Sequence, residues 1–162
     1  MIVKHAMSRH IALVNPTTPV KEIWKLIFSK KINAVPVVDA RNRLQGIIAK
    51  DDLLTLLYPN YEEYISDFTS ASDFEEMEKK VRNIGQKTAG DIMKRRVIFT
   101  WEETPLMRAL SRMIVRHVDQ LPVLSQDYKV VGMITKGDIF YALFKKKIEP
   151  AARAAARKIR RK

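Results

Sequence analysis

The sequence of 162 residues contains no cysteine, which excludes a disulfide scaffold, a thiolate metal site and a cysteine nucleophile. No apolar run is long enough to span a bilayer, and the N-terminus lacks the apolar core and cleavage site of a signal peptide. Histidine occurs only three times, without the spacing of a ligand set, and glycine only five times. We therefore expect a cytoplasmic protein without a metal site.

Common catalytic signatures are also missing. The chain has no glycine-rich phosphate loop ending in Lys-Ser/Thr, no Gly-x-Ser-x-Gly turn and no His-Glu-x-x-His helix. Each of these patterns places a nucleophile, a phosphate cradle or a metal ligand where its chemistry needs it. Their absence predicts a protein that is not an enzyme and holds no catalytic cofactor.

The positive charge is concentrated at the C-terminus. The formal net charge is +12, and residues 145–162 hold nine Lys or Arg and one Glu, so the folded body is only mildly basic. A basic tail over residues 149–162 favours an electrostatic contact with nucleic acid or with an acidic protein. It lacks the interleaved aromatic residues of a base-stacking surface. The alternative is a solubilising end, or a helix lying on an acidic segment.

The chain is an internal repeat. Offset by 86 residues, residues 7–57 match residues 93–143 over 51 positions without a gap. Chance gives roughly three identities at ordinary residue frequencies, whereas eleven are found. Such self-similarity predicts two copies of one supersecondary unit. The identical pairs are Met7/Met93, Arg9/Arg95, Thr18/Thr104, Pro19/Pro105, Pro36/Pro122, Val37/Val123, Gly46/Gly132, Ile48/Ile134, Lys50/Lys136, Asp52/Asp138 and Leu57/Leu143.

Each repeat shows one series of patterns. A short strand precedes a Thr-Pro helix start, in which Thr caps free N–H groups and Pro fits the first turn. An apolar-Pro-Val strand follows, whose proline we expect at the strand start or at an edge. A third strand then leads into a helix opened by Asp. The elements lie at 11–14, 20–27, 35–38, 44–49 and 52–57, and again at 97–100, 106–113, 121–124, 130–135 and 138–144.

The repeats occupy residues 1–57 and 89–148, and the segment 58–88 between them is acidic, with seven Asp or Glu against four Lys or Arg. Its Ser72-Asp73-Phe74-Glu75 forms a capping-box pattern. Apolar residues continue at helical spacing, which predicts one helix packed on the body: Phe74, Met77, Val81 and Ile84.

The ordered set Met, strand, Thr-Pro helix, apolar-Pro-Val strand and Gly-apolar-apolar-x-x-x-Asp resembles the cystathionine-β-synthase (CBS) domain, twice. The resemblance implies an α+β fold of layered α/β units, two pseudo-twofold-related β-α-β-β-α repeats with two clefts, commonly assembled as a homodimer. It also implies a regulatory module that binds AMP, ADP, ATP or an S-adenosylmethionine-type ligand, with AMP favoured, and signals to an unidentified partner.

The main candidate cleft contains the segment from Gly132 to Asp138, where a strand runs into a helix N-terminus that favours an anion. The Asp138 carboxylate suits a ribose diol and Thr135 suits the ribose or first phosphate, roles that the resemblance assigns. The alternative is that Asp138 only caps the helix. The resemblance completes the cleft with His10, Ile11, Ala12, Ile32, Asn33, Ala34 and Asp119, of which Ile11 and Ile32 equally suit core packing. Lys136 either compensates the charge of Asp119 or is a solvated surface lysine.

The second cleft departs from this pattern. Ala49 replaces the Thr135 hydroxyl, and Asp51 adds a second carboxylate beside Asp52 that repels phosphate. We expect it to be weaker or empty, although Asp119 burdens the main cleft with a negative charge. The remaining residues of the second cleft are Arg96, Ile98, Val118 and Gln120.

The sequence thus predicts a regulatory adenosine-nucleotide module. The rival hypothesis is an adaptor that binds nucleic acid or protein through its basic tail, with the repeats as a dimerising scaffold. A third is a structural dimer with vestigial clefts.

Overall fold

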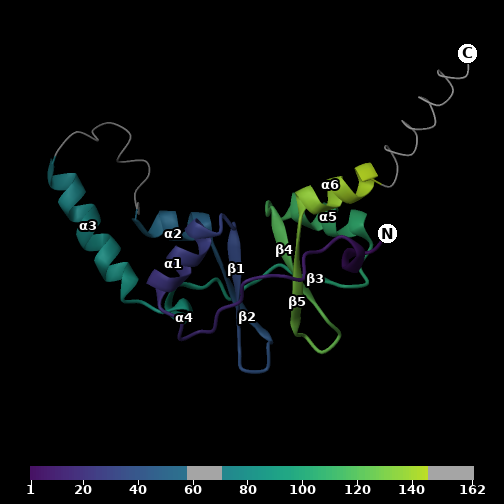
Figure 1. Ribbon diagram of the computed structural model, residues 1–162, viewed down its shortest axis with the longest axis horizontal. Helices are drawn as coiled ribbons and strands as arrows, with labels where there is room; N and C mark the ends of the chain where they lie inside the picture. Colours follow the sequence, from purple (N-terminus) through teal and green to yellow (C-terminus); the bar gives the residue numbers. More distant parts are fainter. Residues whose placement is uncertain (58–70, 146–162) are drawn as a thin grey trace, which may run out of the picture. The chain divides into compact units, whose positions relative to one another are not determined.

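The computed structural model describes residues 1–57 and 71–145. The predicted basic tail lies outside the described residues, and its contacts stay a prediction. No described helix is long and apolar enough to cross a membrane. The chain forms two compact units (Figure 1). The first-repeat unit comprises residues 12–97, and the second-repeat unit comprises residues 1–11 and the described residues from 98 onward.

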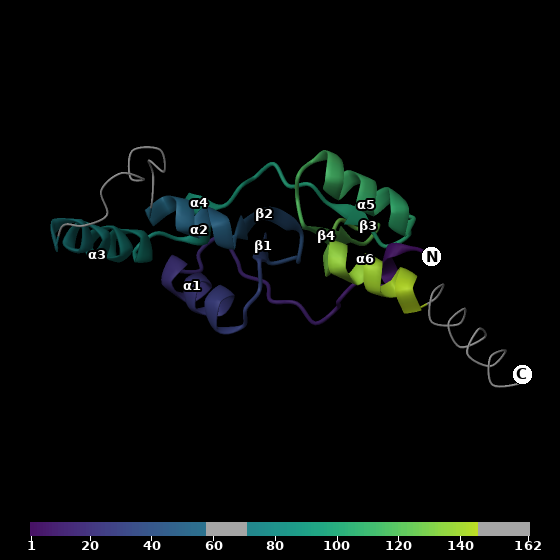
Figure 2. The same ribbon diagram turned by 90° about the horizontal axis from the view of Figure 1, so that it is seen from above.

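The first-repeat unit is a two-stranded antiparallel sheet with helices on one side (Figures 1 and 2). Val35 pairs with Ile48, and Pro36 with Ile47. The elements are α1 (Val20–Ser29), β1 (Ala34–Val38), β2 (Leu44–Ala49), α2 (Lys50–Leu57), α3 (Ala71–Gly85) and α4 (Ala89–Ile92).

The second-repeat unit has a three-stranded sheet in the order β3-β4-β5, in which β3 is parallel and β5 antiparallel to β4. Its elements are η1 (Val3–His5), β3 (Thr100–Trp101), α5 (Leu106–Val115), β4 (Gln120–Leu124), β5 (Val130–Thr135) and α6 (Lys136–Leu143). The predicted order β-α-β-β-α is confirmed for the second repeat, while the first repeat follows it from its helix onward, as α-β-β-α. The predicted third strands match β2 and β5 residue for residue.

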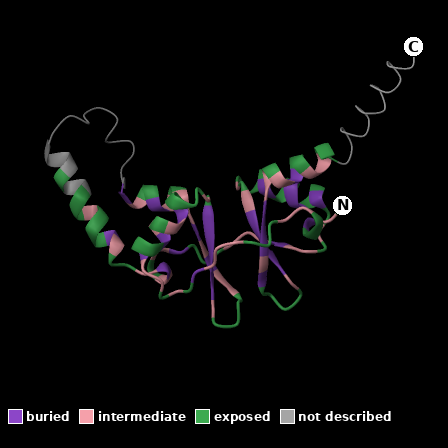
Figure 3. Ribbon diagram, in the orientation of Figure 1, coloured by how far each residue is buried: buried purple, intermediate pink, exposed green. Residues whose placement is uncertain are grey.

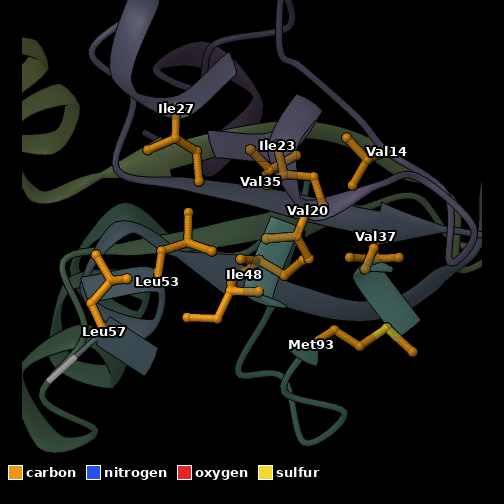
Figure 4. Packing of buried hydrophobic residues seen from close by; sticks show 12 residues of the cluster. Val14, Val20, Ile23, Ile27, Val35, Val37, Ile48, Leu53, Leu57 and Met93 are labelled. Carbon is orange, nitrogen blue, oxygen red and sulfur yellow. The ribbon is translucent and has the colours of Figure 1, made fainter. Parts of the chain in front are cut away.

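Each unit has its own apolar core (Figure 3). In the first-repeat unit, Val20, Ile23 and Ile27 of α1 lie against Val35 and Ile48 of the sheet (Figure 4). In the second-repeat unit, all four residues predicted for the apolar stripe of α5 are buried: Leu106, Ala109, Leu110 and Met113. The helical spacing in the sequence therefore identified the core face of both helices.

The segment that opens each repeat packs on the unit of the other repeat. Val3, near the start of the first repeat, is fully buried in the core of the second-repeat unit, and Ser8 exchanges two backbone hydrogen bonds with Met133. Met93, near the start of the second repeat, lies in the core of the first-repeat unit, and the adjacent Lys94 exchanges two bonds with Ile47. The second-repeat unit is therefore discontinuous in sequence, whereas the first-repeat unit is the continuous stretch 12–97, which includes the opening segment of the second repeat.

The predicted linker helix is confirmed as α3, which begins at Ala71, one residue before the predicted cap. It packs against α1 and α2. Ile84 of the predicted stripe is buried, while Val81 is 46% exposed. The side chains of Phe74 and Met77 lie outside what the structure describes. A cavity of about 150 Å³ remains under the helix, lined by Val20, Lys21, Trp24, Leu57, Val81, Ile84 and Gly85.

Two strand predictions were wrong, for one reason. The expected strand at 11–14 reduces to a single parallel bridge between Val14 and Val37, and β3 starts only at Thr100. The Val14 N–H donates to the Pro36 carbonyl, and the Val14 carbonyl accepts from the Val38 N–H. The next hydrogen bond toward the N-terminus of this parallel pair would need an N–H on Pro36, which proline lacks.

The prolines lie inside β1 and β4 and not at a strand start. Pro36 lies in an edge strand, as predicted, because its sheet has only two strands. Pro122 lies in the middle strand of its sheet, but β3 pairs only with Val123 and Leu124, beyond the proline.

The predicted helix starts also need correction. Thr18 and Thr104 do not cap α1 and α5: their hydroxyls accept from the N–H groups of Asn15 and Trp101 in the preceding turns. The prolines that follow them take the N-cap position. Asp does not open α2 or α6, which begin two residues earlier, at Lys50 and Lys136.

Candidate functional site

Asp138 and Thr135 form a reciprocal pair at the start of α6. The Thr135 hydroxyl accepts from the Asp138 N–H at 3.0 Å, while Oδ2 of Asp138 accepts from the Thr135 N–H and hydroxyl, both at 2.8 Å. This is a capping box. The capping alternative for Asp138 is therefore present, yet it uses only one carboxylate oxygen. Within the described residues, Oδ1 of Asp138 accepts no hydrogen bond and stays open to a diol.

The box changes what Thr135 can do. Its single hydroxyl proton is directed to Asp138, so a ligand oxygen would have to compete for it. Thr135 has one more acceptor lone pair, but phosphate oxygens at neutral pH need donors. The geometry therefore gives Thr135 the role of holding Asp138 in one rotamer.

Lys136 is held by Asp119 in the same unit. The Lys136 ammonium lies 2.8 Å from Oδ1 of Asp119, and the Lys136 N–H donates to the Asp119 carbonyl at 3.0 Å. The Asp119 side chain is 83% exposed, so the ion pair is weak and open to exchange. The negative charge predicted to burden the main cleft is thus balanced by the neighbouring lysine.

Asp52, the counterpart of Asp138, is already occupied on both oxygens. Its Oδ2 accepts from the Ala49 N–H at 3.0 Å, and its Oδ1 lies 2.6 Å from the ammonium of Lys94. Ala49 supplies no hydroxyl, so only half of the capping box forms. Asp51, the predicted source of repulsion, is exposed beside it.

Helices α1 and α5 end in the same type of turn. In α5 the Val118 N–H donates to the Met113 carbonyl and the His117 N–H to the Ile114 carbonyl, the pattern of a Schellman motif. His117 has φ 52°, and its counterpart after α1, Lys31, has φ 53°. The turn brings the chain back into the sheet and sets the positions of Ile32 and Val118, both predicted site residues, in the second position after the helix cap.

The other predicted residues are divided between the units. The second-repeat unit holds His10, which is exposed, and Ile11, which is half-buried. The first-repeat unit holds four: Ala12 and Ile32 (half-buried), Asn33 (exposed) and Ala34 (buried). Within the first-repeat unit, the Asn33 carbonyl accepts from the Lys50 N–H at 2.8 Å.

Several predicted residues also serve the cores. Ile32 packs on the first-repeat core, while Ile98 and Val118 pack on the second-repeat core. Gln120 lies in β4, and Arg96 is exposed. The core-packing alternative for Ile32 is therefore present in part, since it remains half-buried.

The described residues contain no group of acidic or histidine side chains able to hold a metal. A groove of about 820 Å³ opens in the first-repeat unit, but no residue predicted to bind nucleotide lines it. Its lining comes from residues 13–18, Glu22, Leu26 and residues 38–40.

Sequence reasoning missed Lys94. One signal was available: in the 86-residue register, Lys94 corresponds to Ser8, so a charge is present in one repeat and absent from the other. That difference pointed to no partner, because Asp52 is 42 residues away along the chain.

Comparison with known proteins agrees with this architecture. The chain is 27% identical over 147 residues to the CBS domain-containing protein CBSX2, chloroplastic, of Arabidopsis thaliana, covering 87% of this chain and 62% of that protein. It is 25% identical over 154 residues to protein MJ1426 of Methanocaldococcus jannaschii, covering 88% and 91%. The chain thus spans less than two thirds of the length of CBSX2.

Solved structures are similar in fold. A crystal structure of CBSX2 in complex with AMP matches with a TM-score of 0.70 at 26% identity, covering 90% of this chain and 98% of that one. The CBS domain pair of MJ0100, in complex with 5′-methylthioadenosine and S-adenosyl-L-methionine, matches at a TM-score of 0.65 and 24% identity, which shows the fold alone. The CBS domain family model matches residues 3–59 and 89–145. The chain therefore belongs to the CBS domain family, of which it contains two copies.

Proposed function

We propose that this protein is a regulatory module that binds an adenosine nucleotide, AMP in the first instance, at the cleft containing Asp138, and that it catalyses no reaction. The observation that carries the proposal is the state of the Asp138 carboxylate. One oxygen is fixed by the capping box, and the other accepts no hydrogen bond within the described residues. A vicinal diol needs such a fixed and open acceptor.

Each residue of the cleft has a distinct role in this proposal. Asp138 accepts hydrogen bonds from the ribose hydroxyls, and Thr135 positions it. The Lys136 ammonium leaves Asp119 and pairs with the phosphate. The free-energy cost of breaking the Lys136–Asp119 ion pair is small, because the Asp119 side chain is exposed. The N–H groups at the start of α6 add a favourable field for the anion. The adenine contacts proposed from the sequence are His10, Ile11, Ala12, Ile32, Asn33 and Ala34.

The ligand class is supported by the likeness to CBSX2, whose crystal structure contains AMP. A ligand that binds one conformation better than another shifts the population toward it, and a partner protein can read that shift. This is the regulatory part of the proposal, and the partner is defined only by its sensitivity to the nucleotide.

Isothermal titration calorimetry of the full chain with AMP tests the proposal. Asp138→Ala is expected to remove the tight binding phase, because the diol loses its acceptor and charged hydrogen bonds contribute about 1.5–3 kcal/mol each. Asp52→Ala is the matched variant at the equivalent position and is expected to leave that phase intact. Tight binding that survives Asp138→Ala and disappears in Asp52→Ala would assign the nucleotide to the other cleft.

We further propose a homodimer formed through α5 and α6. These helices and Phe144, which follows α6, expose large apolar side chains at 52–71%: Met107, Ile114, Val115, Phe140, Tyr141 and Phe144. The equivalent positions of the first-repeat unit include Lys21, Ser29 and Thr55, and α3 packs against the two helices that carry them. Exposed apolar patches of this kind mark interaction surfaces. A second copy offers the same apolar face, and two such faces cover each other symmetrically.

The dimer is tested by light scattering at tens of micromolar protein. The wild-type chain is expected at the dimer mass and Tyr141→Asp at the monomer mass, because a carboxylate in an apolar contact is costly. Thr55→Asp places the same charge at the equivalent position of the first-repeat unit and is expected to stay dimeric. A monomeric wild-type chain would refute the assembly without touching the nucleotide proposal.

A further inference from the structure

The most specific asymmetry between the two repeats lies at the carboxylate that opens each cleft. Asp52 has both oxygens engaged, one by Lys94 at 2.6 Å and the other by the Ala49 N–H at 3.0 Å. The Asp52 side chain is 19% exposed. A diol that approaches this carboxylate has to displace a cation that is covalently part of the same chain.

The backbone holds Lys94 close to its partner. Lys94 and Ile47 exchange two hydrogen bonds of 3.0 Å, which anchor residue 94 beside β2, the strand that runs into the helix of Asp52. The preceding residue, Met93, is buried against Gly46. The ammonium therefore reaches Asp52 from a fixed base, and its effective concentration there is high.

The equivalent position of the other repeat has no such cation. Ser8 takes the place of Lys94 in the 86-residue register, and it makes the same pair of backbone bonds, with Met133, at 2.9 and 3.0 Å. The backbone arrangement is thus the same in both units, and only the side chain differs. A serine carries no charge, and Oδ1 of Asp138 has no partner within the described residues.

We propose that Lys94 is a tethered counter-ion that occupies the ribose-binding carboxylate of the Asp52 cleft and weakens nucleotide binding there. The inference rests on the proposed function, because it takes Asp52 and Asp138 as equivalent diol acceptors. The Lys94 side chain is 67% exposed, so the ion pair is a competitor that a ligand has to displace and not a closed barrier. Its removal should raise AMP affinity at this cleft about fivefold, the upper end for an exposed pair.

Calorimetric titration of AMP into the full-length chain tests the role of Lys94. Lys94→Ser, which copies the other repeat, is expected to strengthen AMP binding at the Asp52 cleft about fivefold, so that it is measured as a second binding event. Asp52→Ala in the same background is expected to remove that event. Ser8→Lys is expected to weaken the Asp138 cleft. Arg95→Ser is the control, because it removes an equal charge from the adjacent residue. The Arg95 side chain is exposed and makes no ion pair within the described residues, so AMP affinity should not change.

The outcomes separate this inference from the proposed function. A wild-type chain that binds AMP through Asp138, together with a Lys94→Ser variant that gains no second event, leaves the function standing and overturns the role of Lys94. Weaker AMP binding in Lys94→Ser also overturns it, because Lys94 would then be a phosphate ligand. A second event in Lys94→Ser supports the role even if the first cleft proves to be misassigned. Matching thermal melts of the variants exclude misfolding as the cause.

Discussion

Met93 lies directly over Gly46: a Cβ atom added to this glycine would come within 2.6 Å of the methionine sulfur. The second repeat repeats the relationship, because a Cβ on Gly132 would meet the Met7 sulfur at 3.0 Å. Two of the eleven identities in the self-alignment, Met7/Met93 and Gly46/Gly132, are therefore one contact made twice. Each methionine belongs to the opening segment of one repeat, and each glycine to the third strand of the other.

We predict that Gly132→Ala destabilises the fold. The added Cβ would lie 2.6 Å from the Ser8 carbonyl oxygen, a backbone atom that can move only by breaking the bridge to Met133. The free energy of unfolding should fall by about 1–3 kcal/mol, as for overpacked cores. Gly85→Ala is the control, because its nearest atom would be 3.9 Å away, and alanine favours a helix by up to about 1 kcal/mol. Equal urea midpoints for the two variants would contradict the prediction.

We predict that His117→Gly stabilises the fold. His117 has φ 52° in the turn that ends α5, a conformation that costs an ordinary L-residue about 1 kcal/mol and glycine almost nothing. The unfolding free energy should rise by about that amount. Arg116→Gly, one residue earlier with φ −95°, gains nothing and loses chain entropy, so it should destabilise. Urea denaturation of both variants measures the difference, and a loss of stability in His117→Gly would disprove it.

The residue that precedes the helix is Thr135 at α6 and Ala49 at α2. Replacing each of these residues by the other type should shift the free energy of unfolding in opposite directions. Thr135→Ala removes two hydrogen bonds to Asp138 and should lower the unfolding free energy by about 1 kcal/mol. Ala49→Thr offers Asp52 the same hydroxyl and should recover part of that amount. Denaturant midpoints at constant slope report the change. If Ala49→Thr alone opened the Asp52 cleft to AMP, the hydroxyl and not Lys94 would limit it.

We predict an acid-sensitive contribution from Asp91 at the start of α4. The hydrogen bond from the Thr88 N–H, and then that from its hydroxyl, hold the pKa of Asp91 below its usual value of 3.8. The folded state thus binds the proton less readily than the unfolded state. The stabilisation is complete above the unfolded pKa and is lost as the pH falls through the folded one.

Thermal melts of Asp91→Asn from pH 7 down to pH 2 check this dependence. The difference in Tm from the wild-type chain should be largest near neutral pH and should shrink below about pH 4, where the unfolded aspartate takes up its proton. Asp127→Asn, at an exposed position of the β4–β5 hairpin, provides the comparison for simple loss of a surface charge. A difference that grew toward acid pH would reverse the sign of the argument.

The sequence by itself determined the repeat, the helices and the third strands, since these follow from local periodicity read twice in one register. It also placed Asp52 and Asp138 at equivalent helix starts, in the third residue of α2 and of α6. The late start of strand pairing in both opening segments, at Val14 and at Thr100, could also have been predicted from the sequence, because proline has no N–H to give to a neighbouring strand.

Only the tertiary structure decided which unit each opening segment completes and how each carboxylate is occupied. Val3 is buried in the same core as Leu106, and the Lys94 ammonium forms an ion pair with Asp52. In both cases the two residues are far apart along the chain. Local propensity carries no information about such partners, because a buried valine or an exposed lysine suits many positions equally well. The two clefts therefore share a backbone pattern that the sequence predicts, and differ through an ion pair that only packing reveals.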